Sequence, residues 1–218
     1  MSLQSKLDAF KAQFVKKAPA QALDIMARST LTLRESGVLA SAIQVGQKVE
    51  DVTLSNQDQK PISLSEVTAD GPVILSFFRG IWCPYCNIEL EALNSALPEV
   101  AAQNAKLVAI SPQTPQHSAK LKADKKLAFD ILYDEANRFA ERLGVAFTLP
   151  EELAAIYKQF GINLPSYNGD ESWRLPMPTR LIVDETLTVR YAAIDPDYTV
   201  RPDPSETIAS LRSLRQTA

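Results

Sequence analysis

The chain has 218 residues, of which 45% are hydrophobic and 22% are charged, so its composition is that of an average globular protein and excludes a disordered or fibrous chain. Its 23 basic and 26 acidic residues give a net charge of −3, so there is no extended positive field to hold nucleic acid or an anionic membrane. The longest apolar stretch, residues 72–78, is much shorter than the roughly 20 residues that span a bilayer. Residues 1–10 contain no signal-peptide pattern, which predicts a cytoplasmic protein.

The first part of the chain is expected to be helical. Apolar residues recur at helical spacing from residue 3 to residue 36, with a break near Pro19. Gly37 ends this pattern, and a different pattern begins near residue 45. We therefore predict an N-terminal helical extension, residues 1–45, followed by one domain, residues 46–218.

The domain that follows alternates between expected strands and helices. The expected strands are residues 52–54, 73–78, 106–111, 131–133, 180–183 and 188–193. The expected helices are residues 84–104, 113–126, 135–143, 149–160 and 205–214. A capping box at residues 148–151 is expected to start the fourth helix, residues 165–177 to form an irregular connection, and the last two strands to form a hairpin. This order predicts an α/β fold with a mixed sheet flanked by helices.

One short segment concentrates the candidate chemistry. Cys83 and Cys86 form a Cys-x-x-Cys pair at the junction of an expected buried strand and an expected helix. A thiol at a helix N-terminus is stabilised as the thiolate by unpaired backbone N–H groups, so Cys83 is the expected nucleophile. Pro84 suits the first helical position, and Cys86 is placed to resolve a bond to Cys83. Arg79 can add a positive charge nearby.

Other interpretations of these residues stay open at this point. The two cysteines could be small buried hydrophobic residues or half of a zinc site. A zinc site would need two more ligands, and the single histidine, His117, lies in a polar stretch typical of a surface residue. We therefore expect no metal and no cofactor. Trp82 is expected either to pack beside the reactive thiol or to contact the substrate.

A second signal is Pro178, which lies directly ahead of an expected strand. A proline cannot donate to a strand ladder, so it is typical of the position where a strand begins. A cis peptide bond would justify a proline there, and Pro178 could then face Cys83; an ordinary trans proline is the other interpretation.

Taken together, these motifs resemble the thioredoxin superfamily, and within it the peroxiredoxin-like proteins of the alkyl hydroperoxide reductase and thiol-specific antioxidant (AhpC/TSA) family. The resemblance covers about residues 46–218 and rests on residues 45–54, 79–86, 147–153 and 195–198. It implies a thioredoxin-like fold, a peroxidatic role for Cys83 and a cis-proline at the pair Pro178 and Thr179. The tetrapeptide Cys-Pro-Tyr-Cys is similar to the glutaredoxin active site, which adds Tyr85 to the supporting residues.

The chain departs from typical peroxiredoxins at three positions. Ser76 and Gly80 stand where those proteins carry a proline and a peroxide-binding threonine. Pro178 stands where they hold the peroxide with an arginine. Arg79 and Arg180 are therefore the candidates to orient the peroxide oxygen.

The leading hypothesis is a thiol peroxidase, in which the Cys83 thiolate reduces a hydroperoxide and the resulting sulfenic acid condenses with Cys86 to a disulfide. An external thiol, namely thioredoxin, glutaredoxin or glutathione, would then reduce that disulfide. One alternative is a dithiol-disulfide oxidoreductase acting on protein or glutathione disulfides, and another is a redox-sensing module without turnover. We expect no nucleic-acid or membrane partner, with a homodimer as one option.

Overall fold

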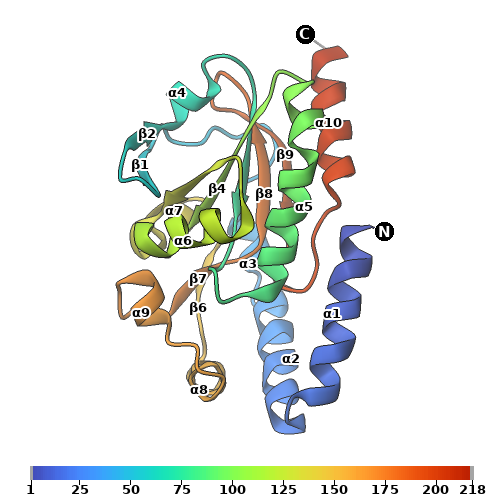
Figure 1. Ribbon diagram of the computed structural model, residues 1–218, viewed down its shortest axis with the longest axis vertical. Helices are drawn as coiled ribbons and strands as arrows, with labels where there is room; N and C mark the ends of the chain where they lie inside the picture. Colours follow the sequence, from blue (N-terminus) through green and yellow to red (C-terminus); the bar gives the residue numbers. More distant parts are fainter. Residues whose placement is uncertain (1, 217–218) are drawn as a thin grey trace.

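A mixed sheet with helices on both faces forms the body of the protein (Figure 1). The computed structural model describes residues 2–216, and in that range the large sheet has the strand order β2-β1-β5-β4-β3-β8-β9. Its strands are β1 (Thr53–Asn56), β2 (Pro61–Ser63), β3 (Val73–Phe77), β4 (Lys106–Ser111), β5 (Asp130–Tyr133), β8 (Thr179–Val183) and β9 (Val189–Ile194). The strands β3, β4 and β5 are parallel, and the remaining pairs are antiparallel. This arrangement confirms the predicted fold class.

The helices account for most of the rest of the chain. They are α1 (Leu3–Lys17), α2 (Ala20–Glu35), α3 (Val38–Ser41), α4 (Leu64–Thr68), α5 (Pro84–Ala101), α6 (Pro115–Lys125), α7 (Arg138–Arg142), α8 (Glu151–Gln159), α9 (Leu164–Asn168), α10 (Pro204–Gln216) and a short 3-10 helix (Glu135–Asn137). Pro19 separates α1 from α2, so the predicted break is confirmed. Between residues 2 and 216, no helix combines the length and apolar character needed to cross a membrane.

The central strand β3 divides the hydrophobic core into two layers, because successive side chains of a strand point to opposite faces. Ile74 packs in the layer that contains Leu90 of α5. Leu75 packs in the opposite layer, with Phe139 of α7. All five residues of β3 are buried, as expected for a strand that is covered on both faces.

The N-terminal helices form a hairpin that lies beside the domain (Figure 1). Leu7 of α1 is fully buried in the same core layer as α5. Ile25 of α2 packs in a third, smaller cluster with Leu153 of α8. The hairpin is therefore held at both α5 and α8.

Two local predictions were wrong because they missed a small second sheet. Strand β6 (Ala146–Thr148) pairs with β7 (Arg174–Pro176), so Thr148 ends a strand instead of capping a helix. The helix α8 begins after Pro150 and has no side-chain cap. The same pairing corrects the expected irregular connection, since residues 165–177 contain β7 and most of α9.

The expected cis bond at Pro178 is also wrong, because residues 2–216 contain no cis peptide bond. Pro178 lies in the short segment that joins β7 to β8, between two backbone hydrogen bonds. The Met177 N–H donates to the Val145 carbonyl (2.7 Å), and the Pro178 carbonyl accepts from the Asp195 N–H (3.2 Å). The trans bond, which is the ordinary form for proline, suits a chain that continues from one strand into the next.

Candidate active site

Cys83 lies where the chain leaves β3 and enters α5, as the sequence predicts. It occupies the N-cap position of α5, and Pro84 is the first helical residue. Two hydrogen bonds fix the preceding loop: the Cys83 N–H donates to the Gly80 carbonyl (3.0 Å), and the Ile81 N–H donates to the Gln113 side chain (2.7 Å). Both cysteines are free thiols with exposures of 1% and 0%. The site is therefore a buried thiol pair at a helix N-terminus.

Gly80 has a role in this loop that no larger residue could fill. Its φ of +146° is rarely adopted by residues with a side chain, and a Cβ atom here would lie 2.5 Å from the indole Nε1 of Trp82. The position at which typical peroxiredoxins carry a threonine is thus closed to any side chain, because Trp82 occupies the space.

Arg79 is a buried cation that lines the same cavity as Cys83, and aromatic rings enclose its guanidinium. The guanidinium carbon lies 4.5 Å from the ring centre of Tyr198, 4.9 Å from that of Trp82 and 5.4 Å from that of Tyr157. Its Nη2 donates a hydrogen bond to the Tyr157 hydroxyl. Burial alone would lower the pKa of Arg79, but the neighbouring Tyr157 and Cys83 outweigh it and raise that pKa above its ordinary value. A desolvated cation held in this way favours a thiolate beside it.

Two residues at the thiol carry buried hydrogen-bond donors without partners. Within residues 2–216, the Nε of Arg79 and the Nε1 of Trp82 are buried and have no hydrogen-bond partner. Both residues line the same cavity as Cys83, with a volume of about 230 Å³. An unpaired buried donor is costly, so these two groups are candidates to donate to a small oxygen-containing ligand.

The two thiols titrate in opposite directions. Burial would raise the pKa of Cys83, but the hydrogen bond from the Cys86 thiol and the charges of Arg79 and Arg201 outweigh burial and lower it to about 6. Burial, together with the hydrogen bond to Cys83, raises the pKa of Cys86 well above its ordinary value. At neutral pH the pair is therefore a Cys83 thiolate next to a Cys86 thiol, which supports the predicted order of nucleophile and resolving thiol.

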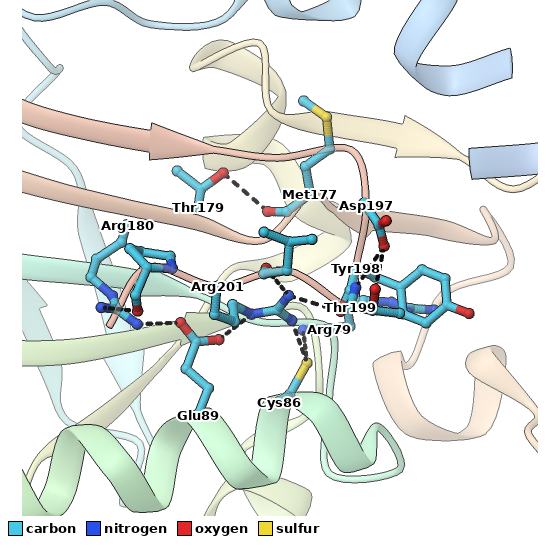
Figure 2. Close-up of polar contacts among 12 residues, drawn as sticks. Arg79, Cys86, Glu89, Met177, Thr179, Arg180, Asp197, Tyr198, Thr199 and Arg201 are labelled. Atoms are coloured by element: carbon cyan, nitrogen blue, oxygen red, sulfur yellow. Dashed lines mark hydrogen bonds and ion pairs between the residues drawn. The ribbon is translucent and has the colours of Figure 1, made fainter. Parts of the chain in front are cut away.

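A buried charge cluster lies behind Cys86 (Figure 2). Glu89 accepts from Arg180 Nη2 at 2.6 Å and from Arg201 Nε, and all three side chains are almost completely buried. The Nη2 of Arg201 lies 3.7 Å from the sulfur of Cys86. One carboxylate therefore serves two guanidinium groups, which leaves a net positive charge at the resolving thiol.

The structure gathers most of the predicted site residues and leaves two of them apart. The cavity at Cys83 is lined by the predicted Arg79, Trp82, Pro84 and Tyr85. Pro178 instead lines a neighbouring cavity that it shares with Arg79 and Tyr157, and the Thr179 hydroxyl donates to the Met177 carbonyl (3.0 Å). Arg180 is paired with Glu89, so of the two candidate oxygen-orienting arginines only Arg79 lines the cavity. Cys86 is buried behind Cys83, against Arg201.

Sequence reasoning missed four residues of the site, namely Tyr157, Tyr198, Glu89 and Arg201. A signal for Glu89 was present, because it lies three residues after Cys86 and therefore on the same buried face of α5. A carboxylate on a buried helix face requires a cation. Spacing along the sequence does not tell which basic residues of the chain pair with Glu89.

The charge of Arg79 yields a testable result. The Arg79→Met variant is expected to raise the pKa of Cys83 from about 6 by roughly 1 to 3 pH units, because an opposite charge at this range stabilises the thiolate by that amount. The measurement is the alkylation rate of Cys83 as a function of pH, read by mass spectrometry. The exposed Arg138, which forms a surface ion pair with Glu135, provides the matched control Arg138→Met. An unchanged midpoint in the Arg79 variant would contradict this account of the site.

The sequence and the fold of this chain are similar to those of known proteins. Residues 45–192 match a family model described as the AhpC/TSA family. The chloroplastic peroxiredoxin Q of Triticum aestivum is 24% identical over 157 residues, which are 70% of this chain and 72% of the relative. Peroxiredoxin Bcp of Bacillus subtilis is 25% identical over 133 residues, which are 61% of this chain and 82% of the relative. The crystal structure of peroxidoxin BcpB from Mycobacterium tuberculosis superposes with a TM-score of 0.63 at 22% identity, covering 79% of this chain and 99% of that one.

Proposed function

Because the chain belongs to the AhpC/TSA family and is a peroxiredoxin-like thiol peroxidase, we propose that it reduces hydroperoxides with Cys83 as the peroxidatic residue and Cys86 as the resolving residue. The observation that carries this assignment is the pair of buried free thiols at the start of α5, with Cys83 at the helix N-cap in a cavity shared with Arg79 and Cys86 against Arg201. The opposite pKa shifts of the two thiols support it. The division into a helical extension, residues 1–45, and a thioredoxin-like domain, residues 46–218, is part of the proposal, and the family match beginning at residue 45 supports it.

The first step is attack of the Cys83 thiolate on the terminal oxygen of the hydroperoxide. A sulfur–oxygen bond forms, the oxygen–oxygen bond breaks, and Cys83 becomes a sulfenic acid while the leaving alkoxide or hydroxide takes up a proton. The unpaired Nε of Arg79 and Nε1 of Trp82 are the proposed donors to the peroxide oxygens. They would take the place of the hydroxyl that Gly80 lacks.

The second step joins the two cysteines. The Cys86 sulfur attacks the sulfur of the Cys83 sulfenic acid and expels hydroxide, which leaves as water with the proton of Cys86. Arg201, at 3.7 Å, is placed to stabilise negative charge on the Cys86 sulfur as that proton departs. Two equivalents of an external thiol then reduce the disulfide and are themselves oxidised to a disulfide.

The burial of Cys83 favours a peroxidase over the alternative dithiol-disulfide oxidoreductase. With 1% of Cys83 exposed, its sulfur is reached through the cavity, whose volume suits a small hydroperoxide better than a folded protein. Reduction of the disulfide by a protein thiol then requires that the site open after oxidation. The redox-sensing alternative shares the chemistry of the first two steps and differs only in lacking turnover with a reductant.

The reductant and the compartment complete the proposal. Thioredoxin, glutaredoxin or glutathione would regenerate the dithiol, and these systems keep thiols reduced in the cytoplasm, which is the compartment we propose. A homodimer stays a prediction.

The Cys86→Ser variant tests the assignment of the two cysteines. One equivalent of hydrogen peroxide is expected to leave a sulfenic acid at Cys83 in this variant, because the second step has no thiol to complete it. Mass spectrometry after trapping with dimedone should find one adduct per chain, located at Cys83. The unaltered protein should instead lose two hydrogens and form the Cys83–Cys86 disulfide without an adduct. A variant that gives no adduct at Cys83 would overturn the proposed order of reaction.

A further inference from the structure

One wall of the cavity at Cys83 comes from the N-terminal hairpin. Phe10 and Phe14 of α1 and Met26 of α2 line the cavity on this side, and the domain after residue 45 supplies the remaining walls. Cys83 lines this cavity, whereas Cys86 is buried behind it. A reductant of the Cys83–Cys86 disulfide must therefore approach the Cys83 sulfur through the space that α1 borders.

The half of α1 that carries Phe10 and Phe14 is held weakly. Leu3 and Leu7, in the first half of the helix, are buried in the core layer that contains α5. From residue 8 to residue 17 no side chain is buried, and only Phe10 and Phe14 are partly buried. We call residues 8–17 the gate. A segment with few buried apolar contacts opens at a much lower cost in free energy than the core does.

Two ring pairs and a hydrogen bond connect the gate to the domain. Phe10 meets Tyr85 edge-to-face with ring centres 5.1 Å apart, and Phe14 meets Phe160 edge-to-face at 6.0 Å. A hydrogen bond of 3.3 Å joins Lys11 to the segment before α10. The gate faces α2 across a cavity of about 390 Å³, so the two helices of the hairpin are not tightly packed there. A helical segment this short is only marginally stable on its own, so its folded state depends on these few contacts.

We propose that the gate unfolds locally in the oxidised protein and thereby admits a protein dithiol reductant to Cys83. This inference rests on the proposed function, because it concerns the reduction of the disulfide which that function forms. With the gate folded, the Cys83 sulfur is reached only by molecules that fit the cavity; with the gate unfolded, the wall made by Phe10 and Phe14 is removed. The family match begins at residue 45, so the gate lies outside the region shared with the family.

The reduction that follows is an ordinary thiol–disulfide exchange. A thiolate of the partner attacks the Cys83 sulfur, the Cys83–Cys86 bond breaks, and Cys86 leaves as a thiolate that takes up a proton. The second thiol of the partner then attacks the mixed disulfide and frees Cys83. The partner is oxidised to a disulfide, and both cysteines of this chain return to the reduced state.

The test loosens the gate without altering the cavity. Ala9 and Ala12 are exposed residues of the gate that do not line the cavity at Cys83, so Ala9→Gly and Ala12→Gly are the test variants. Glycine is less stable than alanine inside a helix, by an amount that raises the population of an unfolded gate by roughly two- to fivefold. Ala209→Gly, at an exposed position of α10 that does not line this cavity, is the matched control.

The measurement is the rate at which the disulfide is reduced after oxidation by one equivalent of hydrogen peroxide. Thioredoxin is the protein reductant, and dithiothreitol is a reductant small enough to use the cavity with the gate folded. The rate with thioredoxin follows the population of the open gate, so it should rise by roughly two- to fivefold in Ala9→Gly and Ala12→Gly. The rate with dithiothreitol should stay the same in both variants, and Ala209→Gly should change neither rate.

Three results would overturn the inference. They are unchanged thioredoxin rates in both test variants, equal increases for thioredoxin and dithiothreitol, and a disulfide that dithiothreitol reduces but thioredoxin does not. In each of these cases the disulfide still forms, so the proposed function stands. A protein in which peroxide produces no Cys83–Cys86 disulfide would refute the proposed function, and the inference with it.

Discussion

Replacing Cys83 by serine is expected to abolish hydroperoxide turnover, with a loss of at least roughly a thousandfold in kcat/KM. A serine hydroxyl stays protonated at neutral pH and is a weak nucleophile without an adjacent base, whereas the Cys83 sulfur is mainly thiolate at that pH because its pKa is about 6. Hydrogen peroxide consumption with a thioredoxin or glutathione reducing system measures the effect. Burial of a hydroxyl in place of the thiol changes the shape of the site little, so the variant should fold.

Cys86→Ser is the control for this result, because it removes a thiol from the same helix and leaves the nucleophile in place. It should retain the first oxidation by one equivalent of peroxide and lose only the disulfide. If Cys83→Ser consumed peroxide at the rate of the unaltered protein, the thiolate mechanism would be wrong.

Removing the carboxylate of Glu89 is expected to destabilise the fold by about 3–5 kcal/mol, because it leaves Arg180 and Arg201 buried with one counter-charge fewer. Such a loss is a large part of the free energy of unfolding of an ordinary domain, roughly 5–15 kcal/mol. The measurement is the free energy of unfolding of Glu89→Ala from chemical denaturation.

Glu91 offers a matched control on the same helix. Its carboxylate pairs with Lys125 at 2.6 Å but is half exposed, so Glu91→Ala should lose no more than about 1 kcal/mol. Equal losses in the two variants would show that the Arg180–Glu89–Arg201 cluster does not hold the structure behind Cys86.

Strands and helix ends that have a clear local sequence pattern could be predicted. Residues 73–78 and 106–111 are mostly apolar, and the central strands β3 and β4 lie there. Cys83 could be placed at a strand-to-helix junction for the same reason, because the apolar run ends just before it and Pro84 suits the first helical turn.

The parts that depend on pairing between distant segments could not be predicted. Thr148 and Glu151 look like the two ends of a capping box. Thr148 instead pairs with Arg174 in a strand, and this pairing decides its conformation. Propensity is a weak guide wherever such a partner exists. The expectation of a cis bond at Pro178 came from its position ahead of a strand and from the family resemblance, and the trans bond shows that neither holds for this detail.

Only some of the charged residues of the site could be predicted from the sequence. Arg79 lies four residues before Cys83, so its charge could be assigned to the site from spacing. Arg201 lies 115 residues after Cys86 and approaches it only because the segment before α10 folds back across α5. The aromatic enclosure of Arg79 depends in the same way on Tyr157 and Tyr198, which lie on other segments of the chain.

The most direct test of the central claim is the second-order rate constant of the reduced protein with hydrogen peroxide, recorded by stopped-flow tryptophan fluorescence. Trp82 adjoins Cys83 and packs on Arg79 and Tyr157, so it should report oxidation of the sulfur. The Trp173→Phe background leaves Trp82 as the single tryptophan, and Cys83→Ser in that background assigns the signal. We predict a fast phase, well above the rate of a free thiolate, that rises with pH through about 6 and is absent in Cys83→Ser. A rate no greater than that of an ordinary thiolate would contradict a site built for peroxide reduction.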